Sequence, residues 1–205
     1  MRFFILIVLI VLSDFCVAQE ADSVFYSSGE LKGYGLLCNN LKEGEWFFYY
    51  PNGVLSAVLN HKNGELQGVQ EYYDSDGNLI IIEHREQGLL EDSSKYYYPA
   101  GQLKKKGYFE DGLYEGKWVF YFENGVLKQE GTYVQGLPQG EWSFFFDNGN
   151  LNRKGFLRNG KEDGFWKYFD KEGNQTYEGH WKAGKKVGTW YYFKKGKQKK
   201  WKSFD

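Results

Sequence analysis

Short runs of aromatic and β-branched residues alternate with polar turn sequences along most of the chain, and the alternation repeats every 24 residues, as from Gly125 to Gly149 (149 − 125 = 24). Residues 116–140 show one unit, in which two such runs are separated by Asn124–Gly125 and followed by Gln135–Gly136. Runs of this length bounded by glycine turns predict β-hairpins, and Asn-Gly favours a type I′ turn with positive φ at both central residues. Each unit therefore predicts about two strands and two turns.

A glycine recurs at the same position of every repeat with unchanged spacing, which is typical of a repeat protein. We call such a set of equivalent positions a column. Units of this length stack on their neighbours, so we expect an elongated all-β array with no central pocket. The column consists of Gly29, Gly53, Gly77, Gly101, Gly125, Gly149 and Gly173.

Aromatic residues form further columns, and aromatic side chains make up 20% of the chain. Adjacent positions in a strand face opposite ways, so both faces of the sheet are expected to carry rings. We interpret the columns as the core of a thin array, because each large ring buries roughly 150–250 Å². The alternative is a surface that stacks on glycans or grips a partner peptide. The tryptophan column contains Trp46, Trp118, Trp142, Trp166 and Trp190. A second column, later in the same strand, contains Phe48, Tyr72, Tyr96, Phe120, Phe144, Tyr168 and Tyr192. A third, at the next position, contains Phe25, Tyr49, Tyr73, Tyr97, Tyr121, Phe145, Phe169 and Phe193.

The repeat motif of residues 116–140 consists of Gly116, Trp118, Tyr121, Phe122, Asn124, Gly125, Leu127, Gly131, Tyr133, Gly136 and Gly140. This motif resembles that of the MORN-repeat variant family, and the resemblance covers nearly all of residues 19–205. Chains of this kind are similar to the YwqK-type antitoxin components of bacterial toxin–antitoxin modules. The resemblance implies hairpins laid side by side in one long, curved, single-layer antiparallel sheet that serves as a binding scaffold, with no shared catalytic residues.

Residues 1–18 have the pattern of a secretory signal peptide, with Arg2 ahead of an apolar run over residues 3–12. Small residues at Cys16 and Ala18 suit cleavage before Gln19, which leaves residues 19–205 as an array of about seven to eight repeats. We expect a bacterial protein exported to the periplasm or secreted; an uncleaved membrane anchor or a lipoprotein acylated at Cys16 are the alternatives. After cleavage Cys38 is the one remaining cysteine, so no intrachain disulfide is expected.

Acidic and basic residues nearly cancel, with 26 Lys and Arg against 27 Asp and Glu. The chain therefore has no global field that attracts nucleic acid, and a nucleic-acid partner is not expected. A lysine-rich C-terminal run either guards the last strand against edge-to-edge aggregation or makes a weak contact with anionic lipid or acidic glycan at the cell envelope. The run contains Lys194, Lys195, Lys197, Lys199, Lys200 and Lys202.

The repeat pattern breaks between about residues 68 and 107, where Gln70 and Ser94 replace the tryptophan and Asp92 replaces a repeat glycine. Unusual positions in a regular array often mark sites, so these positions are candidates for a polar patch that gives a partner its specificity. The interpretation that we favour is ordinary sequence drift, because polar strand positions usually form the solvent-exposed face of an antiparallel sheet. The predicted patch contains His61, Gln70, His84, Arg85 and Glu86.

No pattern of catalytic or metal-binding chemistry accompanies this patch. His61, His84 and His180 are spread along the array, and no nucleophile elbow, phosphate loop or EF-hand loop occurs. We therefore expect no catalytic residues, metal or cofactor. The sequence favours a non-enzymatic, exported scaffold that binds another macromolecule, most simply a protein, through one face of its sheet. The alternative is an envelope-associated structural protein that contacts glycan or lipid.

Overall fold

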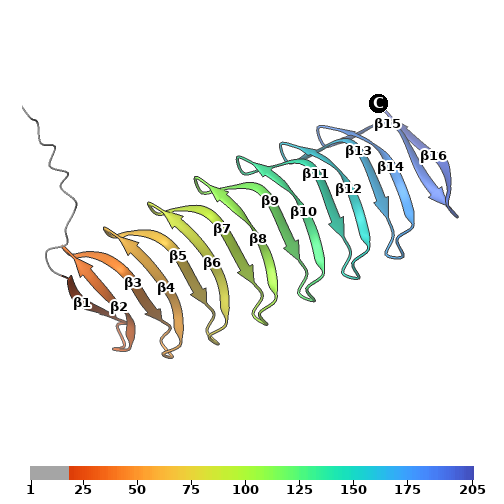
Figure 1. Cartoon of the computed structure of the whole chain (residues 1–205). Coiled ribbons are helices and arrows are strands. Elements are labelled where there is room, and N and C mark those ends of the chain that lie inside the picture. The colour runs from red at the N-terminus through yellow and green to blue at the C-terminus, as the bar shows by residue number, and fades with distance from the viewer. Residues whose placement is uncertain (1–18) are drawn as a thin grey trace, which may run out of the picture.

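The computed structural model describes residues 19–205, which form one open sheet of sixteen antiparallel strands in chain order. Figure 1 shows the hairpins side by side in a single layer, each strand bowed along its length. The predicted all-β, single-layer array is confirmed. The strands are β1 (Gln19–Phe25), β2 (Leu31–Cys38), β3 (Leu41–Tyr49), β4 (Leu55–Lys62), β5 (Glu65–Tyr73), β6 (Leu79–Glu86), β7 (Leu89–Tyr97), β8 (Leu103–Glu110), β9 (Leu113–Tyr121), β10 (Leu127–Val134), β11 (Leu137–Phe145), β12 (Leu151–Arg158), β13 (Lys161–Phe169), β14 (Gln175–Lys182), β15 (Lys185–Lys194) and β16 (Lys197–Phe204).

Two kinds of connection alternate along the array. An odd-numbered strand is joined to the next strand by a longer loop such as residues 122–126, and an even-numbered strand by a two-residue turn such as Gln135–Gly136. Within the described chain only the last hairpin departs from this rule, because the two-residue turn Lys195–Gly196 joins β15 to β16. The strands therefore fall into two classes with different side-chain columns. Across residues 19–205 no helix has the length and apolarity needed to cross a membrane.

The type I′ prediction is wrong for the Asn124–Gly125 connection. Only Gly125 has positive φ there, and its N–H donates to the carbonyl of Phe122 at 2.9 Å, as in a type I turn followed by a left-handed glycine. Asn124 instead accepts from the N–H of Val126 and donates to the carbonyl of Asp147 in the next repeat. Positive φ at both central residues occurs at the two-residue turns, as at Gln135 (49°) and Gly136 (77°).

The core of the array consists of tryptophans packed on glycines of the preceding strand. A Cβ atom on Gly131 would lie 2.2 Å from the ring of Trp142, so only glycine fits beneath the indole. The indole N–H of Trp142 donates to the carbonyl of Thr132, the residue after that glycine. The same arrangement recurs for Gly35 with Trp46, Gly107 with Trp118, Gly155 with Trp166 and Gly179 with Trp190.

The five tryptophans define one side of the sheet, which we call the Trp face. Their side chains are at most 2% exposed, although the sheet has a single layer. Side chains from nearer the turns lie over them: the ring of Tyr114 is 4.1 Å from that of Trp118, and Phe109 packs on the same indole at 5.1 Å. Around Trp118 the Trp face is therefore filled by the protein's own side chains.

The opposite side, which we call the open face, also carries rings. Tyr34 stacks there on Phe47 at 5.2 Å and on Tyr49 at 6.1 Å, whereas Trp46 stacks on Phe48 across the Trp face. The expectation that both faces carry rings is confirmed. Within residues 19–205 no second layer covers the open face, so its side chains are more exposed.

Two sequence expectations concern the N-terminal part of the chain. The predicted signal peptide, residues 1–18, lies outside the described residues. Cys38, at the end of β2, is disulfide-bonded, whereas the expectation of no disulfide applies to the chain cleaved before Gln19 and stays a prediction. That expectation depended on removal of residues 1–18, which the full chain retains.

Candidate functional site

The break in the repeat pattern lies on the Trp face, and Gln70 occupies the tryptophan position there. Its Nε2 atom donates to the carbonyl of Asn60 at 3.1 Å, and its Oε1 accepts from the N–H of Asn60 at 2.9 Å. Nε2 also donates to the carbonyls of Gln67 and Gly68. Gln70 is fully buried and its amide is satisfied by main-chain groups, which keeps the desolvation cost of this polar side chain low.

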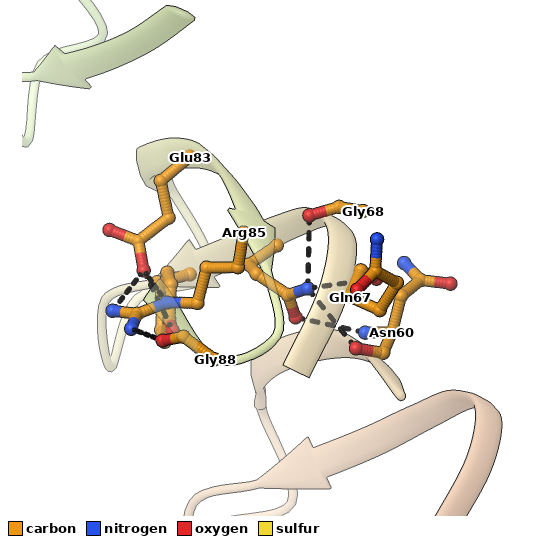
Figure 2. A network of polar contacts seen from close by, with 8 residues as sticks. Asn60, Gln67, Gly68, Glu83, Arg85 and Gly88 are labelled. Atoms are coloured by element: carbon orange, nitrogen blue, oxygen red, sulfur yellow. Dashed lines mark hydrogen bonds and ion pairs between the residues drawn. The ribbon is translucent and has the colours of Figure 1, made fainter. Parts of the chain in front are cut away.

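The next tryptophan position is Ser94, and the glycine that would lie beneath the ring is replaced by Glu83. The Glu83 carboxylate is buried and accepts from Arg85, with the guanidinium nitrogens at 2.7 and 2.8 Å, and from the hydroxyl of Tyr72 at 3.2 Å. Arg85 also donates to the carbonyl of Gly88 at 2.7 Å. Figure 2 shows this ion pair beside the contacts around Asn60, Gln67 and Gly68. A charged network thus occupies space that an indole fills elsewhere.

Two tyrosines beside this network are held in the neutral form. Burial, followed by the negative charge of Glu83, raises the pKa of Tyr96 to about 12. Burial and the same carboxylate raise the pKa of Tyr72. Both hydroxyls therefore remain protonated at neutral pH, and the Tyr72 hydroxyl serves as a hydrogen-bond donor to Glu83.

The structure does not bring the five predicted patch residues together on one accessible surface. Gln70, Arg85 and His61 lie on the Trp face, and His61 is only 8% exposed. His84 pairs with Val69 and Glu91 on the open face, because neighbouring residues of a strand point to opposite sides. Glu86 is exposed at the end of β6. Gln70 is too deeply buried for direct contact with a partner.

The open face carries a series of exposed apolar side chains on alternate hairpins. Tyr108 is 42% exposed and Phe156 is 53% exposed, and each directly follows the glycine of a tryptophan–glycine pair. Val69 and Phe165 precede the tryptophan position and are 47% and 39% exposed. Exposed aromatic side chains aligned on one face are typical of surfaces that bind other molecules.

Hollows in the open face lie between these side chains. One of 310 Å³ is lined by Ser93, Lys95, Lys106, Tyr108 and Val119. Along the array follow a hollow of 240 Å³ around Lys117, Glu130 and Ser143, and one of 310 Å³ around Phe156 and Arg158. Together they form a row from β7 to β13 that has room for the side chains of a partner.

Lysine pairs add positive charge to the same face. Lys95 lies directly opposite Lys106 across β7 and β8, and Lys154 directly opposite Lys167 across β12 and β13. Like charges in this position destabilise a sheet unless something neutralises them. Among residues 19–205 none of these four lysines is ion-paired, whereas nearby Lys117 pairs with Glu130 at 2.8 Å. Lys167 also lies directly opposite Glu178 across β13 and β14, whereas Lys95 and Lys106 have Ile82 and Val119 as their other cross-strand neighbours.

A different hollow lies at the C-terminal end of the Trp face and has a volume of 280 Å³. Lys186 Nζ lies 4.4 Å from the ring centroid of Trp190 and 4.9 Å from that of Trp201. Arg153 and Glu162 approach to 3.7 Å at its rim. The hollow thus joins exposed rings to charged groups. Its lining comprises Arg153, Glu162, Tyr168, Tyr177, Trp181, Lys186, Trp190 and Trp201.

In the described part of the chain, no three His, Cys, Asp or Glu side chains are grouped closely enough to hold a metal ion. His61 and His84 lie on opposite faces, so these two side chains do not form one site.

The sequence prediction did not include the open-face residues Tyr108, Phe156 and Phe165. The signal for them was present, because each is adjacent in sequence to a tryptophan or glycine of the core and must point the other way.

Comparison with curated proteins gives no match. Two solved structures, "Crystal Structure of TcdB2-TccC3-Cdc42" and "Crystal Structure of TcdB2-TccC3-TEV", are each 11% identical over 85% of this chain, with TM-scores of 0.21 and 0.22. This chain spans only 13% of the length of the matched chain in each structure, and such low scores carry no argument about function. The model of the MORN repeat variant matches residues 42–63, 66–87, 93–111, 114–135 and 138–159, more than half of the chain. With its repeated hairpins and its tryptophan–glycine core, the chain belongs to the MORN repeat variant family.

Proposed function

We propose that this repeat scaffold is a non-enzymatic, exported protein that binds another protein across its open face. The observation that carries the proposal is the contrast between the two faces. The Trp face buries its tryptophan column, whereas the open face leaves Tyr108, Phe156 and Phe165 exposed beside a row of hollows. Aromatic anchors that enter such hollows or receive a partner's side chains supply most of the binding energy in protein interfaces.

The Lys95–Lys106 pair, which has no acidic residue directly opposite, gives the partner surface an expected charge. A partner segment rich in Asp and Glu would relieve the repulsion between Lys95 and Lys106. An immunity or antitoxin role is a special case of this function, in which the bound protein is a toxin that acts in the envelope or outside the cell. The signal-peptide pattern of residues 1–18 is the basis for export.

The test is affinity purification of the tagged protein from its own source cells after crosslinking, at low and high salt. We expect one stoichiometric protein that is retained at high salt by the unchanged chain and lost by the variant Tyr108→Ser with Phe156→Ser. The matched control changes Lys199, Lys200 and Lys202 to Gln and should retain the partner. Retention by the open-face variant would contradict the proposal. If the captured protein is toxic when produced alone, the antitoxin version is supported.

A second candidate function is attachment to glycan or lipid at the cell envelope. It is favoured by the C-terminal hollow, where Trp201 is 46% exposed and Tyr177 40% exposed next to the lysines of β16. Attachment through these lysines weakens with ionic strength, because exposed charges are screened by salt. Recovery of glycan or lipid that washes off with salt and is lost by the lysine control variant would support this function against the first.

A further inference from the structure

The sheet ends in two unpaired edges of opposite charge. Among the described residues 19–205, strand β1 pairs only with β2 and strand β16 only with β15, so within this range each has one row of main-chain groups without a strand partner. Strand β1 contains Glu20 and Asp22 and no basic residue. Strand β16 contains no acidic residue and four basic ones, Lys197, Lys199, Lys200 and Lys202. Nearly every side chain of both strands is exposed.

We propose that copies of this chain join head to tail, with β16 of one copy pairing antiparallel with β1 of the next. The inference is independent of the partner protein proposed above. Open strand edges readily pair with other chains, and here each edge offers seven or eight residues for main-chain hydrogen bonds. The partner surface that fits each edge is therefore the opposite edge of a second copy.

The alternation of the two strand classes is continued across this junction. Even-numbered strands are followed by odd-numbered strands throughout the sheet, and β16 followed by β1 obeys the same rule. Asp22 lies one repeat before Trp46 and so occupies the tryptophan position of β1. Lys202 pairs with Trp190 as Gly179 pairs with Trp166, and so occupies the glycine position of β16.

Inside the array, the tryptophan of each odd-numbered strand lies on the glycine of the preceding strand, as Trp190 lies on Gly179. The same register places Asp22 of one copy against Lys202 of the other. An acidic and a basic side chain thus replace the tryptophan–glycine pair at the junction. This parallels the interior break, where Ser94 and Glu83 occupy the equivalent positions.

The charges also select against the symmetric alternatives. Two β16 edges would bring eight lysines together, and two β1 edges would oppose four carboxylates. Like-charge juxtaposition suppresses wrong pairings, so only the head-to-tail pairing is attractive. A head-to-tail contact either closes into a ring or continues as a filament. Sixteen strands at about 4.8 Å spacing give a repeat of about 75 Å for each copy.

The test measures the mass of the protein, purified as the producing cells process it, by sedimentation at 50 and 500 mM NaCl (about 14 and 4 Å screening length). We expect concentration-dependent association that weakens at high salt. The variant Lys199→Glu, Lys200→Glu, Lys202→Glu and the variant Glu20→Lys, Asp22→Lys should each lose at least about 100-fold in association constant. Mixed in equal amounts, the two variants should associate again, because every β16–β1 contact between them joins opposite charges.

A control variant carries the same kind of charge reversal, Lys104→Glu and Lys128→Glu, at exposed residues in the middle of the array. It should associate like the unchanged protein. Circular dichroism verifies that each variant is folded, which the exposure of the changed side chains favours. A monomer at all concentrations and at low salt would overturn the proposal, and so would variants that still self-associate or fail to associate on mixing.

Discussion

Gln70 donates through Nε2 to the main-chain carbonyl of Asn60, at the position where each tryptophan of the array donates to the equivalent carbonyl of the preceding strand. The amide of Gln70 thus preserves the hydrogen bond of the missing indole. The residue beneath it changes as well, since Leu59 stands where the tryptophan repeats have glycine. The tryptophan position and the glycine position beneath it are sterically coupled, because an indole and a Cβ atom cannot occupy the same volume.

This coupling predicts the outcome of transplanting the Leu59–Gln70 pair into an intact region. Gly131→Leu alone should destabilise the protein by about 1–3 kcal/mol or more, because its Cβ would overlap the ring of Trp142. Trp142→Gln alone should cost about 3–5 kcal/mol through lost burial. The double variant should be more stable than the sum of these losses predicts, by about 1 kcal/mol or more. Urea unfolding of the four proteins measures the free energies.

Thr132→Ala serves as the control for this series, because the indole bonds only the main-chain carbonyl of that residue. It should change the free energy of unfolding by less than about 0.5 kcal/mol, as is usual for exposed positions. Strictly additive losses in the double variant would show that the two positions are not coupled.

The reverse exchange should restore the regular core. Gln70→Trp alone is expected to destabilise, because the Cβ of Leu59 lies where an indole requires glycine. Adding Leu59→Gly should recover that loss, since the new pair then matches Gly35 with Trp46. Thermal unfolding followed by tryptophan fluorescence provides the measurement. A single variant Gln70→Trp with unchanged stability would contradict the steric explanation.

The sequence predicted the hairpins and their order well because each structural requirement recurs once in every repeat. Tight turns keep their glycines and the core keeps its tryptophans, so the period is visible without any structure. The disruption at Gln70 and Ser94 is equally visible in the sequence. Its predicted role as a contact surface is wrong for Gln70, because the main chain of Asn60 satisfies this amide and the side chain is fully buried.

Turn type and the composition of each face were harder to predict. Asn-Gly occurs in several turn types, and the structure shows that Asn124 caps a longer loop instead of entering the left-handed region. Strand alternation does separate His84 from Arg85, and this rule would have divided the predicted patch correctly. The rule does not reveal that Glu83 is buried, since that depends on Arg85 and Tyr72 folding over it.

The ion pair between Arg85 and Glu83, where the repeat pattern is interrupted, leads to a prediction about the free energy of unfolding. Arg85→Leu leaves the buried carboxylate of Glu83 without its cationic partner and should destabilise the protein by about 3–5 kcal/mol. Replacing Glu83 by Leu as well should recover much of this loss. Arg158→Leu is the control, because Arg158 is 74% exposed in its pair with Asp163 and should cost at most about 1 kcal/mol. Equal losses for the two arginines in urea unfolding would refute a special role for the buried pair.

The stability of the array should also depend on the protonation of His61. This side chain is 8% exposed, and burial lowers its pKa, an effect that the nearby carbonyl of Leu59 opposes and Lys42 reinforces. The folded state therefore resists the charged form, whereas the unfolded chain takes up a proton at a pH of about 6.5. As the pH falls below that value, the unfolded state binds more protons than the folded state, and stability decreases until the folded pKa is reached.

His61→Leu removes this proton uptake, and leucine already occupies the same column at Leu37 and Leu157. We expect the free energy of unfolding of the unchanged protein to fall more steeply than that of the variant between pH 7 and pH 5. Apart from Glu43, whose charge interacts with His61, the carboxylates contribute equally to both proteins, so the difference between the two curves reports mainly on His61. His180→Leu is the matched control, because His180 is exposed on the open face and its removal does not relieve a buried imidazole. Parallel curves for the unchanged protein and His61→Leu would show that burial does not penalise the charged form of His61.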